Sequence, residues 1–207
     1  MNIGRIIKGV GGNYYVSAKG KIYKCSARGK FRKAKITPTV GDYVQFTILD
    51  ENDCEGALDT IEKRKNILLR PRVANIDCAI ITFAATSPDI NRDLLDRFLI
   101  LAETQNIPKV IICINKSDLV SQEEKDAFAN IYEPYYKVVF TSAEKNIGID
   151  QLKEEIHGCE SVFAGPSGVG KSSLINRLIP ESNRQTGEIS RKIERGKHTT
   201  RQVELLR

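Results

Sequence analysis

The sequence predicts two domains of different class, a small all-β barrel followed by an α/β domain with a mostly parallel sheet. Residues 1–66 contain short segments of alternating, β-branched and aromatic residues, separated by turn residues and without a helical period. From residue 67 onward, apolar strand patterns alternate with helical patterns. A glycine-rich segment at 165–172 joins the last of these strands to a helix. Residues 1–66 and 67–207 are therefore expected to fold as separate domains.

The first domain is predicted to contain five strands, at residues 5–9, 14–17, 22–26, 42–49 and 58–63. Turn residues separate them, among them Gly11-Gly12 and Asn52-Asp53. Five short strands without a helical period favour a small closed barrel. The OB-fold is the nucleic-acid-binding form of such a barrel.

Positive charge is concentrated in the first third of the chain. Residues 1–70 hold 14 Lys and Arg against 7 Asp and Glu, whereas the remaining residues hold 18 against 19. The segment 28–35 lies between the third and fourth predicted strands and carries Phe31 together with five cations, Arg28, Lys30, Arg32, Lys33 and Lys35. This composition suits contact with the phosphates of RNA. The alternative is a basic surface that is merely solvated.

The second domain is predicted to alternate strands with helices. The near-continuous apolar run at 76–84 is typical of a strand buried on both faces of a sheet. Residues 66–75, which include Pro71, are interpreted as the linker between the domains. The predicted strands lie at 76–84, 110–114, 137–140 and 161–164, and the predicted helices at 94–102, 123–131, 149–156 and 172–178.

The segment 165–172 reads G-P-S-G-V-G-K-S and fits the phosphate-loop pattern G-x4-G-K-[ST]. Its glycines let successive backbone N–H groups point at phosphate at the N-terminus of the helix that follows. Lys171 is expected to contact the β- and γ-phosphates, and Ser172 to coordinate Mg²⁺. The expected nucleotide contacts in this segment are Gly165, Pro166, Ser167, Gly168, Val169, Gly170, Lys171, Ser172 and Ser173.

A second motif identifies the base. It reads N-K-S-D, directly follows the predicted strand at 110–114, and consists of Asn115, Lys116, Ser117 and Asp118. The carboxylate of Asp118 suits N1 and N2 of guanine, whereas adenine offers neither donor, so a buried carboxylate would be left unpaired against it. Asn115 is expected to bind the base edge and to brace the phosphate loop. The stem of Lys116 is expected to lie across the base plane.

Two further segments fit the same site. In T-S-A at 141–143, the backbone N–H groups of Ser142 and Ala143 suit O6 of guanine. In R-G-K-H-T-T at 195–200, Thr199 or Thr200 suits the switch threonine that binds Mg²⁺ and the γ-phosphate in GTPases. A basic loop that enters a strand is the alternative. His198 is a candidate for positioning the attacking water, with packing or contact with RNA as the alternatives.

The order of these motifs is itself informative. GTPases usually run phosphate loop, switch Thr, D-x-x-G, N-K-x-D and then S-A, whereas here N-K-S-D and T-S-A precede the phosphate loop. This order indicates a circularly permuted GTPase domain. The chain resembles the circularly permuted ribosome-assembly GTPases, in particular the small-ribosomal-subunit-dependent GTPase A family of bacteria. The likeness includes L-R-P-R-V-A-N-I-D at 69–77 and L-L-D-R-F-L at 94–99.

The resemblance implies GTP hydrolysis that the small ribosomal subunit stimulates, during late maturation of that subunit. It also implies Mg²⁺ bound with GTP and an N-terminal domain bound to rRNA. The family carries a D-T-P-G motif and a C-terminal zinc domain, and these 207 residues contain neither. The GTPase domain is therefore expected to be incomplete at its C-terminal end, with zinc only in a further domain. The alternative function is a nucleotide-dependent RNA-binding module with negligible GTPase activity.

Composition disfavours several other classes. No apolar run approaches the ~20 residues of a membrane span. The five cysteines contain no C-x2-C pair, so neither a zinc site nor a disulfide framework is indicated in these residues. We expect a cytoplasmic monomer that binds GTP, GDP and the small ribosomal subunit and does not bind a membrane.

Overall fold

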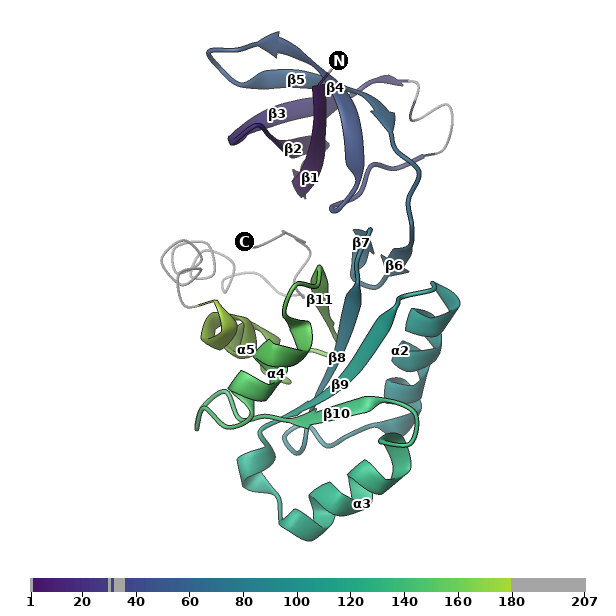
Figure 1. Ribbon diagram of the computed structural model, residues 1–207, viewed down its shortest axis with the longest axis vertical. Coiled ribbons are helices and arrows are strands. Elements are labelled where there is room, and N and C mark those ends of the chain that lie inside the picture. Colours follow the sequence, from purple (N-terminus) through teal and green to yellow (C-terminus); the bar gives the residue numbers. More distant parts are fainter. Residues whose placement is uncertain (1, 30, 32–35, 180–207) are drawn as a thin grey trace. The chain divides into compact units, whose positions relative to one another are not determined.

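The computed structural model describes residues 2–29, 31 and 36–179, which divide into two compact units before and after the Ile76–Asp77 bond. The first unit is built on a closed barrel and the second on a parallel sheet covered by helices (Figure 1). Both predicted architectures are therefore confirmed. None of the helices in the described part of the chain is long and apolar enough to cross a membrane.

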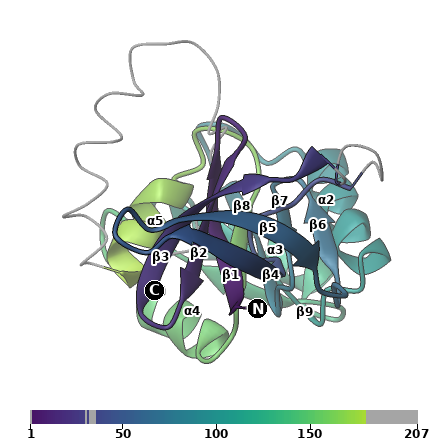
Figure 2. The same ribbon diagram turned by 90° about the horizontal axis from the view of Figure 1, so that it is seen from above.

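The barrel contains five strands in the order β1-β2-β3-β5-β4, and β4 closes it by pairing with β1. Neighbouring strands are antiparallel except for the parallel pair β3 and β5. Seen from above, the strands cross one another as they wrap around the barrel (Figure 2). Their bounds are β1 (Asn2–Val10), β2 (Asn13–Ala18), β3 (Lys21–Ala27), β4 (Tyr43–Asp50) and β5 (Glu55–Ile61).

The barrel core is formed by side chains that alternate inward along the strands, including Ile6, Val16 and Phe46, all fully buried. Phe31 also lies in this core, with 6% of its surface exposed. The sequence places Phe31 within the basic segment 28–35, and the structure shows that its side chain belongs to the barrel core. Because the ring is packed inside the barrel, it does not offer a face for stacking on bases.

Residues 66–75 are not the simple linker that the sequence predicts. They contain an antiparallel hairpin of two short strands, β6 (Ile67–Leu69) and β7 (Arg72–Ala74). Asn66 ties the base of the hairpin, because its Nδ2 donates to Ile76 O at 2.8 Å and its Oδ1 accepts from Ile76 N at 3.0 Å. Asn75 Nδ2 donates to Gly41 O at 3.0 Å. These bonds hold the hairpin in the first unit, so the division follows Ile76, whereas the sequence places a boundary after residue 66.

A buried ion pair stabilises the same unit. Asp42 is fully buried and accepts hydrogen bonds from Arg64 Nε at 2.6 Å and Arg64 Nη2 at 2.8 Å. The backbone N–H of Thr39 donates to the same carboxylate at 2.8 Å. The guanidinium and the N–H together satisfy a charge that is otherwise costly to bury.

The second unit has a four-stranded sheet in the order β10-β9-β8-β11, and all neighbouring strands are parallel. The alternation of strands with helices that the sequence predicts is confirmed. The strands are β8 (Cys78–Ala84), β9 (Lys109–Asn115), β10 (Lys137–Phe140) and β11 (Ser161–Ala164). The helices are α2 (Arg92–Thr104), α3 (Gln122–Tyr132), α4 (Ile149–Ile156) and α5 (Lys171–Leu178), with a 3-10 turn, η1, at Ser117–Leu119.

Helices cover both faces of this sheet, with α4 and α5 on one face and α2 and α3 on the other (Figure 1). On the first face, Leu152 of α4 and Leu174 of α5 belong to a buried cluster with alternate residues of β8 and β9. On the second face, Phe83 of β8 meets Phe98 of α2 with ring centroids 6.1 Å apart. Every residue of β8 is buried, as expected for a strand covered on both sides.

The topology places the functional loops at one edge. Because all four strands are parallel, their carboxyl ends meet at the same edge of the sheet, where α/β proteins bind ligands. The segments at the carboxyl ends of β9, β10 and β11 are 115–118, 141–143 and 165–170, which carry the three predicted motifs. Strand β11 comes last in the chain yet pairs with β8, the first strand of this sheet. This connectivity is the one that a permuted chain requires.

Candidate nucleotide-binding site

A pocket of about 820 Å³ lies at this edge of the sheet. Asn115, Lys116 and Asp118 line it from the end of β9, and Ser142 and Ala143 line it from the end of β10. The phosphate loop and α5 supply the remaining wall, which includes Gly170, Ser173 and Arg177. Motifs that are about 50 residues apart in the sequence therefore share one pocket.

The phosphate loop depends on glycine at positions where other residues do not fit. Gly170 has φ +92°, and a Cβ added there meets Asn115 Nδ2 at 2.2 Å. Gly165 has φ +142°, and an added Cβ meets the carbonyl oxygen of Thr82 in β8 at 2.0 Å. These backbone conformations are strained for L-residues with a side chain, and the space is already occupied. The spacing of glycines in the motif is thus explained by close approach to β8 and to β9.

Lys171 begins α5 and folds back over the phosphate loop. Its Nζ donates to Gly165 O at 2.9 Å and to Pro166 O at 2.5 Å. Burial lowers the pKa of Lys171. The ammonium group therefore lies across the loop whose N–H groups, together with the N-terminus of α5, form the anion-binding end of the site. Ser172 and Ser173 are exposed in the first turn of α5.

Asn115 joins the loops after β9 and β10 to the phosphate loop. Its side chain is almost completely buried, with the residue 3% exposed. Its Nδ2 donates to Val169 O at 2.9 Å, and its Oδ1 accepts from Ala143 N at 3.1 Å. Thr141 Oγ1 lies 3.4 Å from the same oxygen. One amide group thus contacts all three segments of the site.

The remaining residues of N-K-S-D have distinct surroundings. A hydrogen bond from Ser142 lowers the pKa of Asp118, although partial burial opposes this effect. Asp118 is therefore an ionised hydrogen-bond acceptor at neutral pH. Lys116 adopts the left-handed conformation with φ +58°, and its Nζ donates to Ser87 O in the loop after β8. Ser117 is 1% exposed, and its Oγ has no partner among the residues that the structure describes.

The loop after β10 is held by internal hydrogen bonds. Ser142 N donates to Ile147 O at 3.0 Å, and Ala143 N donates to Asn115 Oδ1. The two N–H groups that the sequence assigns to O6 of guanine are therefore both engaged within the protein. No motif predicts Arg177, whose Nε donates to Ala143 O at 2.8 Å from α5. That bond joins residues 34 positions apart, so local sequence patterns carry no signal for it.

Several predicted residues lie outside the described part of the chain. His198, Thr199 and Thr200 are among them, as are four of the five cations of the basic segment, Lys30, Arg32, Lys33 and Lys35. The fifth, Arg28, is described, and its Nη2 lies 3.0 Å from Oδ1 of the nearly buried Asp59. Arg28 thus has a partner within the barrel.

The two ends of the pocket differ in chemistry. Near Gly170 the pocket adjoins the phosphate loop, the N-terminus of α5 and Lys171, and such groups together suit a chain of phosphates. The other end offers the carboxylate of Asp118 and the backbone groups of the loop after β10. These groups suit the polar edge of a base that carries N–H donors. The residues present therefore fit a guanine nucleotide, and the exposed hydroxyl of Ser172 in the first turn of α5 is an oxygen ligand of the kind that Mg²⁺ accepts.

Two family models match the chain. One, described as RsgA GTPase, matches residues 61–207, and the other, described as RsgA N-terminal domain, matches residues 3–57. A relative from Alkaliphilus metalliredigens, named small ribosomal subunit biogenesis GTPase RsgA, is 53% identical over 207 residues. That alignment covers 100% of this chain and 70% of the relative.

Two solved structures are similar to the chain. The crystal structure of YjeQ from Thermotoga maritima matches with a TM-score of 0.73 and 34% identity, over 86% of this chain and 65% of that one. The structure titled YloQ, a circularly permuted GTPase, matches with a TM-score of 0.68 and 43% identity, over 87% of this chain and 65% of that one. The chain thus spans about two thirds of the length of the proteins that it matches, and the predicted circular permutation is confirmed.

Proposed function

Because the chain belongs to the RsgA GTPase family, we propose that it binds GTP and GDP in the pocket at the edge of its parallel sheet and hydrolyses GTP during late maturation of the small ribosomal subunit. The family resemblance that the sequence motifs indicate is confirmed. The observation that carries the proposal is the position of Asn115, whose amide group contacts the phosphate loop and the loop after β10. Hydrogen bonds of this one residue thus connect the loops proposed to bind the base with the loop proposed to bind the phosphates.

Each motif has a role in the proposed complex. Asp118 accepts from N1 and N2 of guanine, and the stem of Lys116 covers one face of the base. The loop that follows β10 lies next to O6 of the base. Residues 165–173 surround the phosphates, with Lys171 on the β- and γ-phosphates. Ser172, with Thr199 or Thr200, holds Mg²⁺, which neutralises charge that develops on the phosphates during hydrolysis.

For the hydrolytic step we propose His198 as the residue that orients the attacking water. A neutral imidazole accepts a hydrogen bond from water near pH 7, because its ordinary pKa is about 6.5. Replacing His198 by Ala is expected to lower subunit-stimulated turnover by ~10²-fold with GTP affinity nearly unchanged. Normal turnover in this variant contradicts the role, and loss of subunit binding indicates RNA contact instead.

The barrel is proposed to bind rRNA phosphates through the basic segment 28–35, which directs the protein to the small subunit. We propose that the protein acts as a cytoplasmic monomer with Mg²⁺ as its cofactor in this chain, and that zinc belongs to a further domain. The name of the Alkaliphilus relative supports the small subunit as the partner.

The alternative is an RNA-binding module that holds a nucleotide without appreciable hydrolysis. Membership of a GTPase family favours the hydrolase. Phosphate release measured with and without small ribosomal subunits separates the two functions. Stimulation by several orders of magnitude supports the hydrolase, whereas a rate that subunits leave unchanged supports the binding module.

Substitution of Asp118 by Asn tests the assignment of the base. An amide no longer accepts from both N1 and N2 of guanine, but it donates to the carbonyl that xanthine carries at C2. Loss of a charged hydrogen-bond pair is expected to cost ~2–3 kcal/mol in GDP affinity and to favour xanthosine diphosphate. Asp126→Asn, on the exposed side of α3, is the matched control. Unchanged GDP affinity in the Asp118 variant shows that guanine is read elsewhere.

A further inference from the structure

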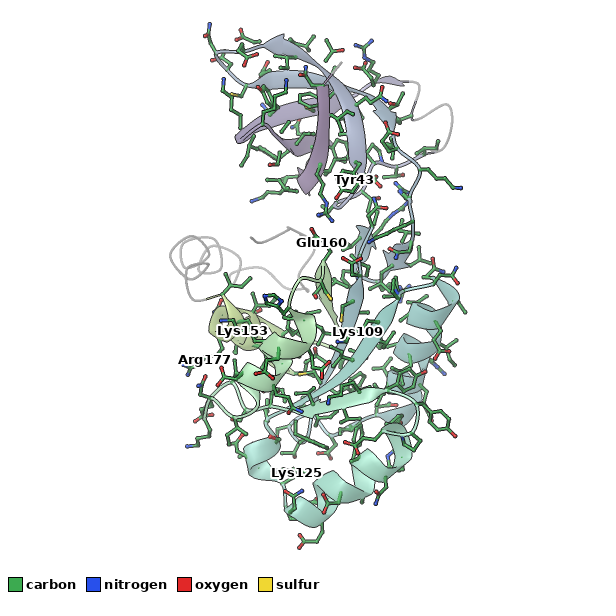
Figure 3. All side chains as sticks on the ribbon, in the orientation of Figure 1. Tyr43, Lys109, Lys125, Lys153, Glu160 and Arg177 are labelled. Carbon is green, nitrogen blue, oxygen red and sulfur yellow. The ribbon has the colours of Figure 1, made fainter. Side chains whose placement is uncertain are left out.

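Arg177 contacts the loop after β10 from a helix that begins at the phosphate loop. It lies six positions after Lys171 in α5 and is labelled in Figure 3. Its Nε donates to Ala143 O at 2.8 Å, and the residue lines the same pocket as Asp118 and Ser142. The bond has a charged donor, which makes it stronger than a bond between two neutral groups.

The peptide that accepts this bond has a second polar group, the N–H of Glu144. Because C=O and N–H of a trans peptide point in opposite directions, the bond to Arg177 also fixes the direction of this N–H. Glu144 lines the pocket. The neighbouring N–H groups of Ser142, Ala143 and Lys145 donate to Ile147 O, Asn115 Oδ1 and Ser142 Oγ. For the N–H of Glu144, no protein acceptor is present among the described residues.

We propose that Arg177 is a specificity-positioning residue, which orients the Ala143–Glu144 peptide so that the Glu144 N–H donates to O6 of the bound guanine. The proposal rests on the proposed function and assigns the O6 contact to a different peptide from the two that the motif suggests. Asn115 fixes the peptide before Ala143, and Arg177 fixes the peptide after it. The loop is thus held from β9 and from α5 at the same time.

The proposed role and a purely structural role of Arg177 predict different effects on nucleotide binding. Loss of Arg177 weakens only ligands that use O6. A loosened α5 disturbs the phosphate loop and weakens every nucleotide alike. Diphosphates of three bases separate these effects. GDP carries O6, the N1 proton and the N2 amine, and IDP lacks only the amine. The 2-aminopurine riboside diphosphate keeps the amine and lacks O6 and the N1 proton, so the variant is compared with wild type for each nucleotide separately.

The test is equilibrium binding of these three diphosphates to the full 207-residue chain and to Arg177→Ala. We expect the variant to bind GDP and IDP ~10-fold more weakly, within the range for loss of one hydrogen bond, and to bind the 2-aminopurine nucleotide within about 2-fold of wild type. Arg177→Lys, which keeps a cationic donor, is expected to recover part of the GDP affinity. Lys153→Ala, which removes an exposed charge from α4, is the control and leaves all three affinities unchanged.

Equal weakening for all three nucleotides overturns the proposal, because it assigns Arg177 to the phosphate end or to folding. An unchanged GDP affinity in Arg177→Ala overturns it as well. If the wild-type chain itself binds neither GDP nor IDP, the proposed function fails, and this outcome is recognised before any variant is compared. Thermal unfolding of each variant without nucleotide verifies that the fold is intact.

Discussion

The barrel and the parallel-sheet unit use their polar groups in different ways. In the barrel, several of the described cations are paired internally, as in the contacts of Arg28 with Asp59 and of Arg64 with Asp42. In the parallel-sheet unit, the pocket is built largely from backbone groups, and one buried amide, that of Asn115, connects its loops. Part of the charge in the first unit therefore stabilises the fold. The motifs of the second unit instead supply the groups that line the candidate binding pocket.

The comparison of the two units explains why charge composition predicts a binding surface less well than a motif predicts a binding site. The excess of positive charge in residues 1–70 includes Arg64, whose guanidinium holds a fully buried carboxylate. That cation is already engaged within the protein. By contrast, a side chain at position 170 clashes with Asn115, so the packing of the site requires glycine at this position of the motif.

The largest effect is expected from removing the structural cation of the barrel. Arg64→Ala leaves the buried carboxylate of Asp42 without its ionic partner, which is expected to destabilise the first unit by about 3 kcal/mol or more. Hydrogen exchange resolved by peptide measures the loss in each unit, and GDP affinity is expected to stay unchanged. Lys63→Ala, at an exposed position, is the control. If Arg64→Ala and Lys63→Ala destabilise the barrel equally, the ion pair between Arg64 and Asp42 does not account for the stability of the barrel.

Neutralising the basic segment is expected to change RNA binding rather than stability. Five phosphate contacts through Arg28, Lys30, Arg32, Lys33 and Lys35 imply an affinity loss of roughly 10²-fold between 50 and 200 mM salt. Replacing all five by Ala is expected to remove this salt dependence. Arg28→Ala alone is expected to have the smallest share, because Arg28 is already paired with Asp59. Salt-insensitive binding, measured by fluorescence anisotropy, contradicts a phosphate-directed surface.

A smaller but more local effect is expected at the phosphate loop. Gly170→Ala places a Cβ at a positive φ and against Asn115 Nδ2, which is expected to weaken GDP binding by at least about 10-fold. The stability of the barrel is expected to be unaffected. Gly158→Ala is the matched control, because Gly158 also has a positive φ but has no atom within 4 Å of an added Cβ. Equal GDP affinities of the two variants contradict the role of the close contact.

The smallest effect is expected at Ser117. Its hydroxyl is buried without a partner among the described residues, so Ser117→Ala removes a polar group that forms no bond there. Stability and GDP affinity are expected to change by less than about 0.5 kcal/mol, and a small gain in stability is consistent with this burial. Asn115→Ala, two positions earlier, is expected to weaken GDP binding strongly. A large loss at Ser117 shows that the hydroxyl has a partner in the nucleotide complex.

The strands and helices were largely predictable from the sequence because their apolar periods are regular, and β10, α4 and β11 have the predicted bounds. The hairpin at 67–74 was not predictable from the sequence, because three-residue strands around Pro71 are too short to show a period. The burial of Phe31 was not predicted, because its neighbours in the sequence are charged. At the site, the position of the motif segments at one edge of the sheet was predictable, because each motif lies at a strand end. The contact of Arg177 with Ala143 depends on tertiary structure alone.

Equilibrium titration of the chain with GTP, GDP and ATP under identical conditions tests the central claim most directly. A pocket that pairs the carboxylate of Asp118 with guanine leaves that group unpaired against adenine. GTP and GDP are therefore expected to bind at least ~10³-fold more tightly than ATP. Comparable affinities for the three nucleotides contradict the account, because the phosphate loop then binds ligands without the base-reading loops.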